Sequence, residues 1–176
     1  KAGKVLEIGS SNFSADQIRE AEAAVKPGAA RFLSVQNRYS VLHREPEQDG
    51  VLAECERLGL AFLPYFPLES GLLTGKIRQG QAAPEGTRLS DAGSASRFIT
   101  AHNMASTERL IAFAESRGHT ILELAFAWLL ARPVVASVIA GATKVEQVHA
   151  NAAAAGWSLT ESDLAEIEGL VSQPVG

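Results

Sequence analysis

The chain has few groups that could form cross-links or bind metals. Its 176 residues include a single cysteine, Cys55, which excludes an intrachain disulfide and any zinc site built on several cysteines. No apolar run approaches the ~20 residues that a membrane-spanning helix requires. The first residues are not followed by a long apolar segment, so no signal peptide is predicted. We therefore expect a soluble, cytoplasmic protein without a metal site.

Basic residues are too few and too scattered for a general nucleic-acid binder. The chain carries 16 Lys and Arg against 20 Asp and Glu, which gives a formal net charge of −4. No Lys/Arg cluster supplies the positive charge that nucleic acids or anionic membrane surfaces require. Apolar residues make up 46% of the chain, which is enough for a packed core. The composition predicts a globular protein that binds neither nucleic acid nor membranes.

Strand and helix patterns alternate along the chain. Short apolar runs predict buried strands at Val5–Ile8, Phe32–Gln36, Ala61–Pro64 and Ser137–Ala140. The first three recur roughly every 27–28 residues with an amphipathic segment between them, which is the period of a βα unit and predicts a parallel sheet buried on both faces. Helix starts are indicated by the capping boxes Ser14/Gln17, Thr120/Glu123, Thr143/Glu146 and Thr160/Asp163.

Four βα units in a row fit either a doubly wound sheet or half of a (β/α)8 barrel. The Gly-rich dinucleotide fingerprint is absent after every predicted strand, which disfavours the first. Residues 77–103 are rich in Gly, Pro, Ser and Ala and show little periodicity. A connection this long is usually a functional loop, so we predict a lid there.

Four segments resemble the second half of the barrel of aldo/keto reductases. They are Gly3–Ser14, Val35–Ser40, Pro64–Lys76, and Ser137–Thr143 with Glu146, Gln147 and Asn151 after it. All follow the order and spacing of that family. The resemblance implies an α/β fold of the (β/α)8 TIM-barrel type, of which residues 1–176 supply about the last four βα units as a half-barrel. It also implies an NAD(P)H-dependent oxidoreductase that reduces aldehydes and ketones to alcohols.

The resemblance implies a set of nicotinamide and pyrophosphate contacts. Ser11, Asn12 and Gln36 match the positions that hydrogen-bond the carboxamide, and uncharged amide and hydroxyl groups suit that ligand. Tyr65 matches the aromatic residue that stacks on the nicotinamide ring. Phe66, the next residue, is also expected to contact the cofactor, and it is a candidate for the substrate pocket as well. The segment that cradles the pyrophosphate is matched by Leu68, Ser70, Gly71, Leu72 and Lys76.

The last βα unit should hold the adenosine end of the cofactor. A helix N-terminus there offers free N–H groups to a phosphate. The residues concerned are Gly141, Ala142, Thr143, Lys144, Gln147 and Asn151. Gly141 stands where many family members have a lysine, and Gln147 where many have an arginine, so Lys144 is the cation expected at a 2′-phosphate. We expect NADP as the cofactor, with NAD as the alternative.

The proton donor of this family has no counterpart in the chain. The resemblance implies a tyrosine, a lysine, an aspartate and a histidine from the first half of the barrel, and no segment here matches them. Tyr39 and Tyr65 are the only tyrosines, and both match other family positions. Three interpretations stay open: part of a longer reductase whose N-terminal half is missing here, a half-barrel that assembles with itself or another chain, and a non-catalytic nicotinamide-nucleotide-binding or sensing module. A small carbonyl compound is the expected substrate in the first two, and Cys55 is expected to be a small buried hydrophobe.

Overall fold

Three short parallel strands form the sheet. The computed structural model describes residues 2–81, 83–90 and 92–174. Strands β1 (Ile8–Ser11), β2 (Phe32–Gln36) and β3 (Ala61–Phe62) pair in that order, so β2 is central. All pairings are parallel, and a register irregularity lies between residues 8 and 9 of β1. The predicted parallel α/β arrangement is therefore confirmed.

The segment that was predicted as a fourth strand lies beside β3 without forming a continuous ladder. Isolated parallel bridges join Phe62 to Val135 and Tyr65 to Ile139. The ladder is interrupted because Pro64 has no N–H to donate, although its carbonyl accepts a bond of 3.0 Å from the Ile139 N–H. The first strand also differs from prediction. It begins at Ile8, and Val5 before it is 67% exposed because no described segment covers it.

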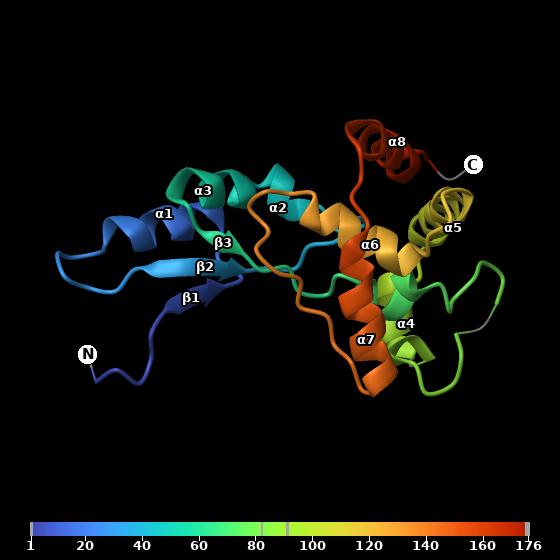
Figure 1. Ribbon diagram of the computed structural model, residues 1–176, viewed down its shortest axis with the longest axis horizontal. Coiled ribbons are helices and arrows are strands. Elements are labelled where there is room, and N and C mark those ends of the chain that lie inside the picture. Colours follow the sequence, from blue (N-terminus) through green and yellow to red (C-terminus); the bar gives the residue numbers. More distant parts are fainter. Residues whose placement is uncertain (1, 82, 91, 175–176) are drawn as a thin grey trace.

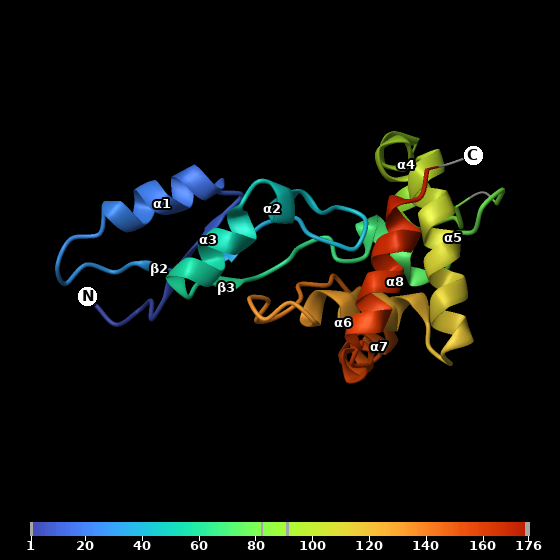
Figure 2. The same ribbon diagram turned by 90° about the horizontal axis from the view of Figure 1, so that it is seen from above.

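Helices occupy one face of the sheet and a second region beyond its end. The α-helices are α1 (Ala15–Ala23), α2 (Glu45–Gln48), α3 (Val51–Leu58), α4 (Ala92–Phe98), α5 (Ala101–Ser116), α6 (Ile121–Leu130), α7 (Val145–Ala153) and α8 (Glu161–Ser172), and the 3₁₀ turns are η1 (Glu69–Thr74), η2 (Arg88–Ser90) and η3 (Ala154–Gly156). Figures 1 and 2 show α1 and α3 on one face of the sheet and α4 to α8 at the opposite end of an elongated molecule. No helix in the described ranges is long and apolar enough to span a membrane.

Only one face of the sheet is covered by described residues, so the prediction of burial on both faces is wrong. Val35 and Phe62 are fully buried in the core that α1 and α3 complete. In β1, by contrast, only Ser10 is buried, while Ile8 is 39% exposed. Figure 1 shows no element below the face opposite α1 and α3. Cys55 of α3 is part of the core as expected, and burial raises the pKa of its thiol to about 11.

Residues 77–103 are more ordered than their composition predicts. The segment contains η2, α4 and the first turn of α5, while residues 82 and 91 lie outside the described part. Leu72 of η1 forms a second small core with Ile77, Leu89, Phe98 and Met104. These apolar residues are too widely spaced to show a period in the sequence, but together they bury enough surface to fold the segment back on η1.

Three of the four predicted capping boxes are present. Ser14, Thr120 and Thr160 each cap a helix in reciprocal hydrogen bonds with the side chain three residues later. The box predicted at Thr143 and Glu146 is wrong. Helix α7 begins one residue later than expected, and the side chain of Gln147 makes the capping contacts instead.

A partly buried polar network joins α2 to the segment just after α6. The Glu47 carboxylate accepts hydrogen bonds from the Tyr39 hydroxyl and from Arg44 at 2.5 Å, and Arg132 lies 3.5 Å away. Burial by itself raises the pKa of Glu47, but the bonds from Arg44 and Tyr39 outweigh it and hold that pKa below its ordinary value. A lowered pKa means that the ionised carboxylate stabilises the fold above the pKa of the unfolded state and stops doing so as the pH falls through the folded-state pKa.

We therefore expect Glu47→Gln to lower the free energy of unfolding by about 1–3 kcal/mol near neutral pH, since the hydrogen bonds to a charged acceptor are lost. The difference from wild type should shrink as the pH falls from the pKa of the unfolded state through the lower pKa of the folded state, because Glu47 is protonated in both states only below the latter. Urea unfolding at several pH values measures this. Glu45→Gln, at an exposed position of the same helix, is the control. A pH-independent deficit in Glu47→Gln would contradict the electrostatic origin.

Candidate functional site

Polar side chains gather at the carboxyl ends of the three strands. The Tyr65 hydroxyl donates a hydrogen bond of 2.7 Å to the Asn12 side-chain carbonyl, and the Asn12 amide lies 3.2 Å from the Ser11 hydroxyl. The Ser11 hydroxyl and the Asn12 backbone N–H both bond to the backbone carbonyl of Gln36, at 3.1 and 3.0 Å. The four residues expected to hold the nicotinamide end thus lie together, although they come from three separate strands.

Parallel pairing produces this arrangement. Ser11 and Gln36 are register partners, and both end their strands at the same edge of the sheet. Tyr65 reaches that edge because its backbone N–H bonds to the carbonyl of Asn37 at 3.1 Å. Asn12 turns away from the strand with a φ of 58°, a conformation that Asn adopts more readily than most residues.

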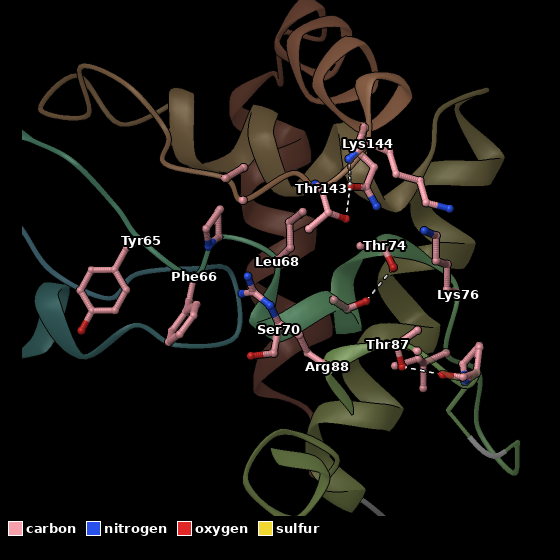
Figure 3. Close-up of a pocket in the computed structure, with 18 of the residues that line it drawn as sticks. Tyr65, Phe66, Leu68, Ser70, Thr74, Lys76, Thr87, Arg88, Thr143 and Lys144 are labelled. Carbon is pink, nitrogen blue, oxygen red and sulfur yellow. Dashed lines mark hydrogen bonds between the residues drawn. The ribbon is translucent and has the colours of Figure 1, made fainter. Parts of the chain in front are cut away.

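A cavity of about 620 Å³ extends from Tyr65 to the start of α7. It is bounded by the turn after β3, the loop that carries η2, and the segment that leads into α7 (Figure 3). The predicted cofactor residues that line it are Tyr65, Phe66, Leu68, Ser70, Gly71, Lys76, Gly141, Thr143, Lys144 and Gln147. Most of the predicted pyrophosphate and adenosine contacts therefore share one cavity, with Tyr65 at its end nearest the strands.

Several predicted contacts are not in this cavity. The side chain of Leu72 is fully buried in the second core, so it cannot reach a ligand. Ala142 and Asn151 do not line the cavity either. Ser11 and Gln36 remain at the sheet edge. Asn12 lines an adjacent cavity of about 320 Å³, in which Tyr65 also takes part.

The N-terminus of α7 differs from prediction. The Gln147 side-chain carbonyl accepts hydrogen bonds from the backbone N–H of Thr143 at 2.7 Å and of Lys144 at 3.2 Å. These N–H groups were expected to be free for a phosphate, but the helix satisfies them itself. A ligand would have to displace Gln147 to use them.

The cavity lining carries more positive than negative charge. Lys76, Lys144 and Arg88 line it, against Glu85 as the one carboxylate among its described lining residues. Figure 3 shows the two lysines on one side and Arg88 reaching in from the loop below. Phe66, Leu68 and Ile139 supply an apolar part of the wall. Such a mixture suits an anionic ligand with flat ring systems.

Arg88 is the site residue that the sequence interpretation missed. A Cβ built on Gly141 would lie 3.5 Å from a guanidinium nitrogen of Arg88, so the guanidinium occupies the space next to the missing side chain at that position. The loop also contains Arg78, which pairs with Glu108, and Arg97, which lies over the Phe98 ring. The sequence alone offers no signal that distinguishes Arg88 from these two.

The parallel βα arrangement, with polar residues at the carboxyl ends of the strands, fits the TIM-barrel class, and a match to a solved structure of that fold supports it. A crystal structure of the thermostable aldo-keto reductase Tm1743 superposes on 93% of the chain with a TM-score of 0.68 and 24% identity, and the match covers 48% of that chain. The profile of the aldo/keto reductase family matches residues 1–172. The chain belongs to the aldo/keto reductase family.

Curated relatives include oxidoreductases. The L-glyceraldehyde 3-phosphate reductase of Escherichia coli K12 is 29% identical over 96% of the chain, and the NADH-specific methylglyoxal reductase of the same strain is 33% identical over 92%. A putative voltage-gated potassium channel subunit beta of Schizosaccharomyces pombe is 32% identical over 97%. The matches cover 50%, 47% and 51% of these proteins, so the chain spans about half the length of the relatives it matches.

The contact between β1 and β2 gives a sharp test of the strand alignment that builds the site. A Cβ at Gly9 would lie 2.2 Å from the Ser34 hydroxyl and 2.9 Å from its backbone carbonyl. We expect Gly9→Ala to destabilise the fold by about 1–3 kcal/mol because the strands must separate. Thermal unfolding measures this, with Gly156→Ala as the control, since a Cβ there meets nothing within 4 Å. Equal melting temperatures for the two variants would contradict the close approach.

Proposed function

We propose that residues 1–176 are the cofactor-binding half of a (β/α)8 aldo/keto reductase, and that the complete barrel reduces small aldehydes or ketones to alcohols with NADPH. The observation that carries the proposal is the continuity of the site. The Tyr65 hydroxyl bonds to the Asn12 side chain, and Tyr65 also lines the cavity that contains Lys76, Arg88 and Lys144. Members of this family usually use nicotinamide cofactors.

The side chains present suit such a cofactor. Asn12, Ser11 and Gln36 offer the amide and hydroxyl groups that a carboxamide requires, and the ring of Tyr65 lies beside them. The three cations would meet the phosphates, and a cavity of about 620 Å³ has the volume of a typical small-molecule site. When bound, the dihydronicotinamide ring supplies the hydride. The residues of this chain hold and orient that ring.

We infer that the proton for the alcohol product comes from outside this chain, because neither tyrosine suits the role of general acid. Tyr39 is fully buried, and its hydroxyl bonds to Glu47. Burial, together with Glu47, raises its pKa, which is unfavourable for a general acid near neutral pH. The Tyr65 hydroxyl already donates to Asn12. We therefore assign the catalytic tetrad to an N-terminal half, whose strands would also cover the open face of the sheet.

A second candidate function is nucleotide binding without turnover. It is favoured by the same finding that both tyrosine hydroxyls already bond to other side chains, and by the similarity to a putative channel subunit. It differs from the first in one measurable property, the transfer of hydride to a carbonyl substrate.

The test uses the complete polypeptide that contains this chain. NADPH and NADH are each titrated by protein fluorescence, and the oxidation of each is followed with methylglyoxal and with glyceraldehyde 3-phosphate as probe aldehydes. The reductase proposal predicts saturable binding and oxidation that depends on aldehyde. Binding without oxidation would favour the nucleotide-binding module, and the absence of binding of both NADPH and NADH would reject both.

Lys144→Ala should weaken NADPH binding more than NADH binding, because only NADPH carries a 2′-phosphate with close to two negative charges. A partly shielded ion pair of this kind contributes roughly 1–3 kcal/mol, so we expect a loss of about five- to a hundredfold in NADPH affinity. Titrations of both cofactors against Lys144→Ala and the distant control Lys26→Ala measure it. Equal losses for the two cofactors would speak against a phosphate contact at Lys144.

The loop of residues 77–103 should close over the cofactor. Glu85, Gly86, Thr87 and Arg88 already form one wall of the cavity. A bound diphosphate would attract Arg88 and slow local opening of this wall, so we expect slower amide hydrogen exchange in the loop with saturating NADPH. Exchange in α8 is the internal reference. Loop exchange unaffected by NADPH would argue against a lid.

A further inference from the structure

A buried carboxylate lies directly behind the cavity wall, and the proposed chemistry does not use it. Glu69, the first residue of η1, is 1% exposed. Its carboxylate accepts a hydrogen bond of 2.6 Å from the Ser40 hydroxyl and forms an ion pair with Arg38, whose side chain is 18% exposed. Burying a charge is unfavourable unless it is paired, and even a paired buried charge often adds little to stability. The presence of this ion pair therefore suggests a role other than stability.

The backbone around Glu69 is in an unfavourable conformation. Phe66, Glu69 and Ser70 have φ values of 54°, 46° and 58°, in the left-handed region that non-glycine residues avoid. Gly71 follows with a φ of 109°. Such conformations persist only where surrounding contacts determine them, and they concentrate at ligand sites. Phe66, Ser70 and Gly71 line the main cavity.

Arg38 connects this turn to two other parts of the site. Its backbone forms a parallel bridge with Tyr65, directly before the turn. Its guanidinium carbon lies 5.1 Å from the ring centroid of Phe98 in α4, and that ring packs edge-on against Phe66 with centroids 6.2 Å apart. Arg38 therefore connects three parts of the site, its backbone bridging the segment after β2 to Tyr65 and its guanidinium contacting Glu69 of the turn and Phe98 of the loop helix.

From these contacts we infer that Glu69 and Arg38 are positioning residues, which hold the turn of residues 66–71 in its left-handed conformation and so present Phe66 and Ser70 to the cofactor. The inference rests on the proposed function. Neither residue lines the main cavity, so their effect on the ligand groups held there is indirect, and Arg38 also lines the adjacent cavity beside Asn12 and Tyr65. If the turn already has its ligand-bound conformation, no binding free energy is lost in ordering it, so the affinity for the ligand is higher.

The test measures NADPH affinity and thermal stability separately in the complete polypeptide. Arg38→Met should weaken NADPH about tenfold, which corresponds to about 1.4 kcal/mol, by leaving Glu69 unpaired. Arg38→Lys keeps a cation beside Glu69 and should stay within about threefold of wild type. Arg97→Met is the matched control. It removes the other guanidinium over the Phe98 ring, at 5.6 Å, without touching Glu69.

A double variant separates positioning from stability. Arg38→Met combined with Glu69→Leu removes both charges, and such replacements often restore stability. If stability returns and NADPH affinity does not, the pair positions the turn. If both return, or if Arg38→Met binds NADPH as wild type does, the inference is wrong. Should Arg38→Met fail to fold, Ser40→Ala removes one bond to Glu69, and unchanged affinity in that variant would also reject the inference. A wild-type protein that does not bind NADPH would reject the proposed function instead.

Discussion

Parallel hydrogen bonding between β1, β2, β3 and the segment before α7 decides where the polar residues at the strand ends lie. Because the strands run in one direction, the residues after each strand meet at one edge. That edge brings Asn12 within hydrogen-bonding distance of Tyr65, although 53 positions of sequence separate them. The bridge from Tyr65 to Ile139 extends the same alignment to the segment that leads into α7. The long cavity is a consequence of this alignment.

Carboxylates inside the protein are paired with cations, whereas the cavity wall carries an excess of cations. The partly buried Glu47 and the buried Glu69 are each matched by arginine and hydroxyl donors, so both carboxylates are satisfied within the protein. Along the cavity wall, Lys76, Arg88 and Lys144 outnumber the single carboxylate of the described lining. An anionic ligand is what such a wall attracts, and a wall of this kind would be unfavourable in a closed core.

Local sequence signals predicted local structure well. The capping boxes at Ser14, Thr120 and Thr160 depend on side chains three residues apart, so the information needed to form them lies within one helical turn. The prediction failed at Thr143 because Gln147 offered a competing acceptor to the same N–H groups. It also failed for the loop of residues 77–103, whose small core is assembled by Leu72 from outside the loop.

The sequence by itself determined the first three strands and the parallel α/β class, which follow from periodicity, a property of neighbours along the chain. Short motifs carried the resemblance to the family, and that resemblance implied half of the described residues that line the main cavity. Only the tertiary structure decided that Leu72 is buried away from the site, that Arg88 lies against Gly141, and that Arg38 pairs with Glu69. Each of these depends on where a long side chain ends after distant segments have packed together. No pattern of neighbouring residues encodes that position.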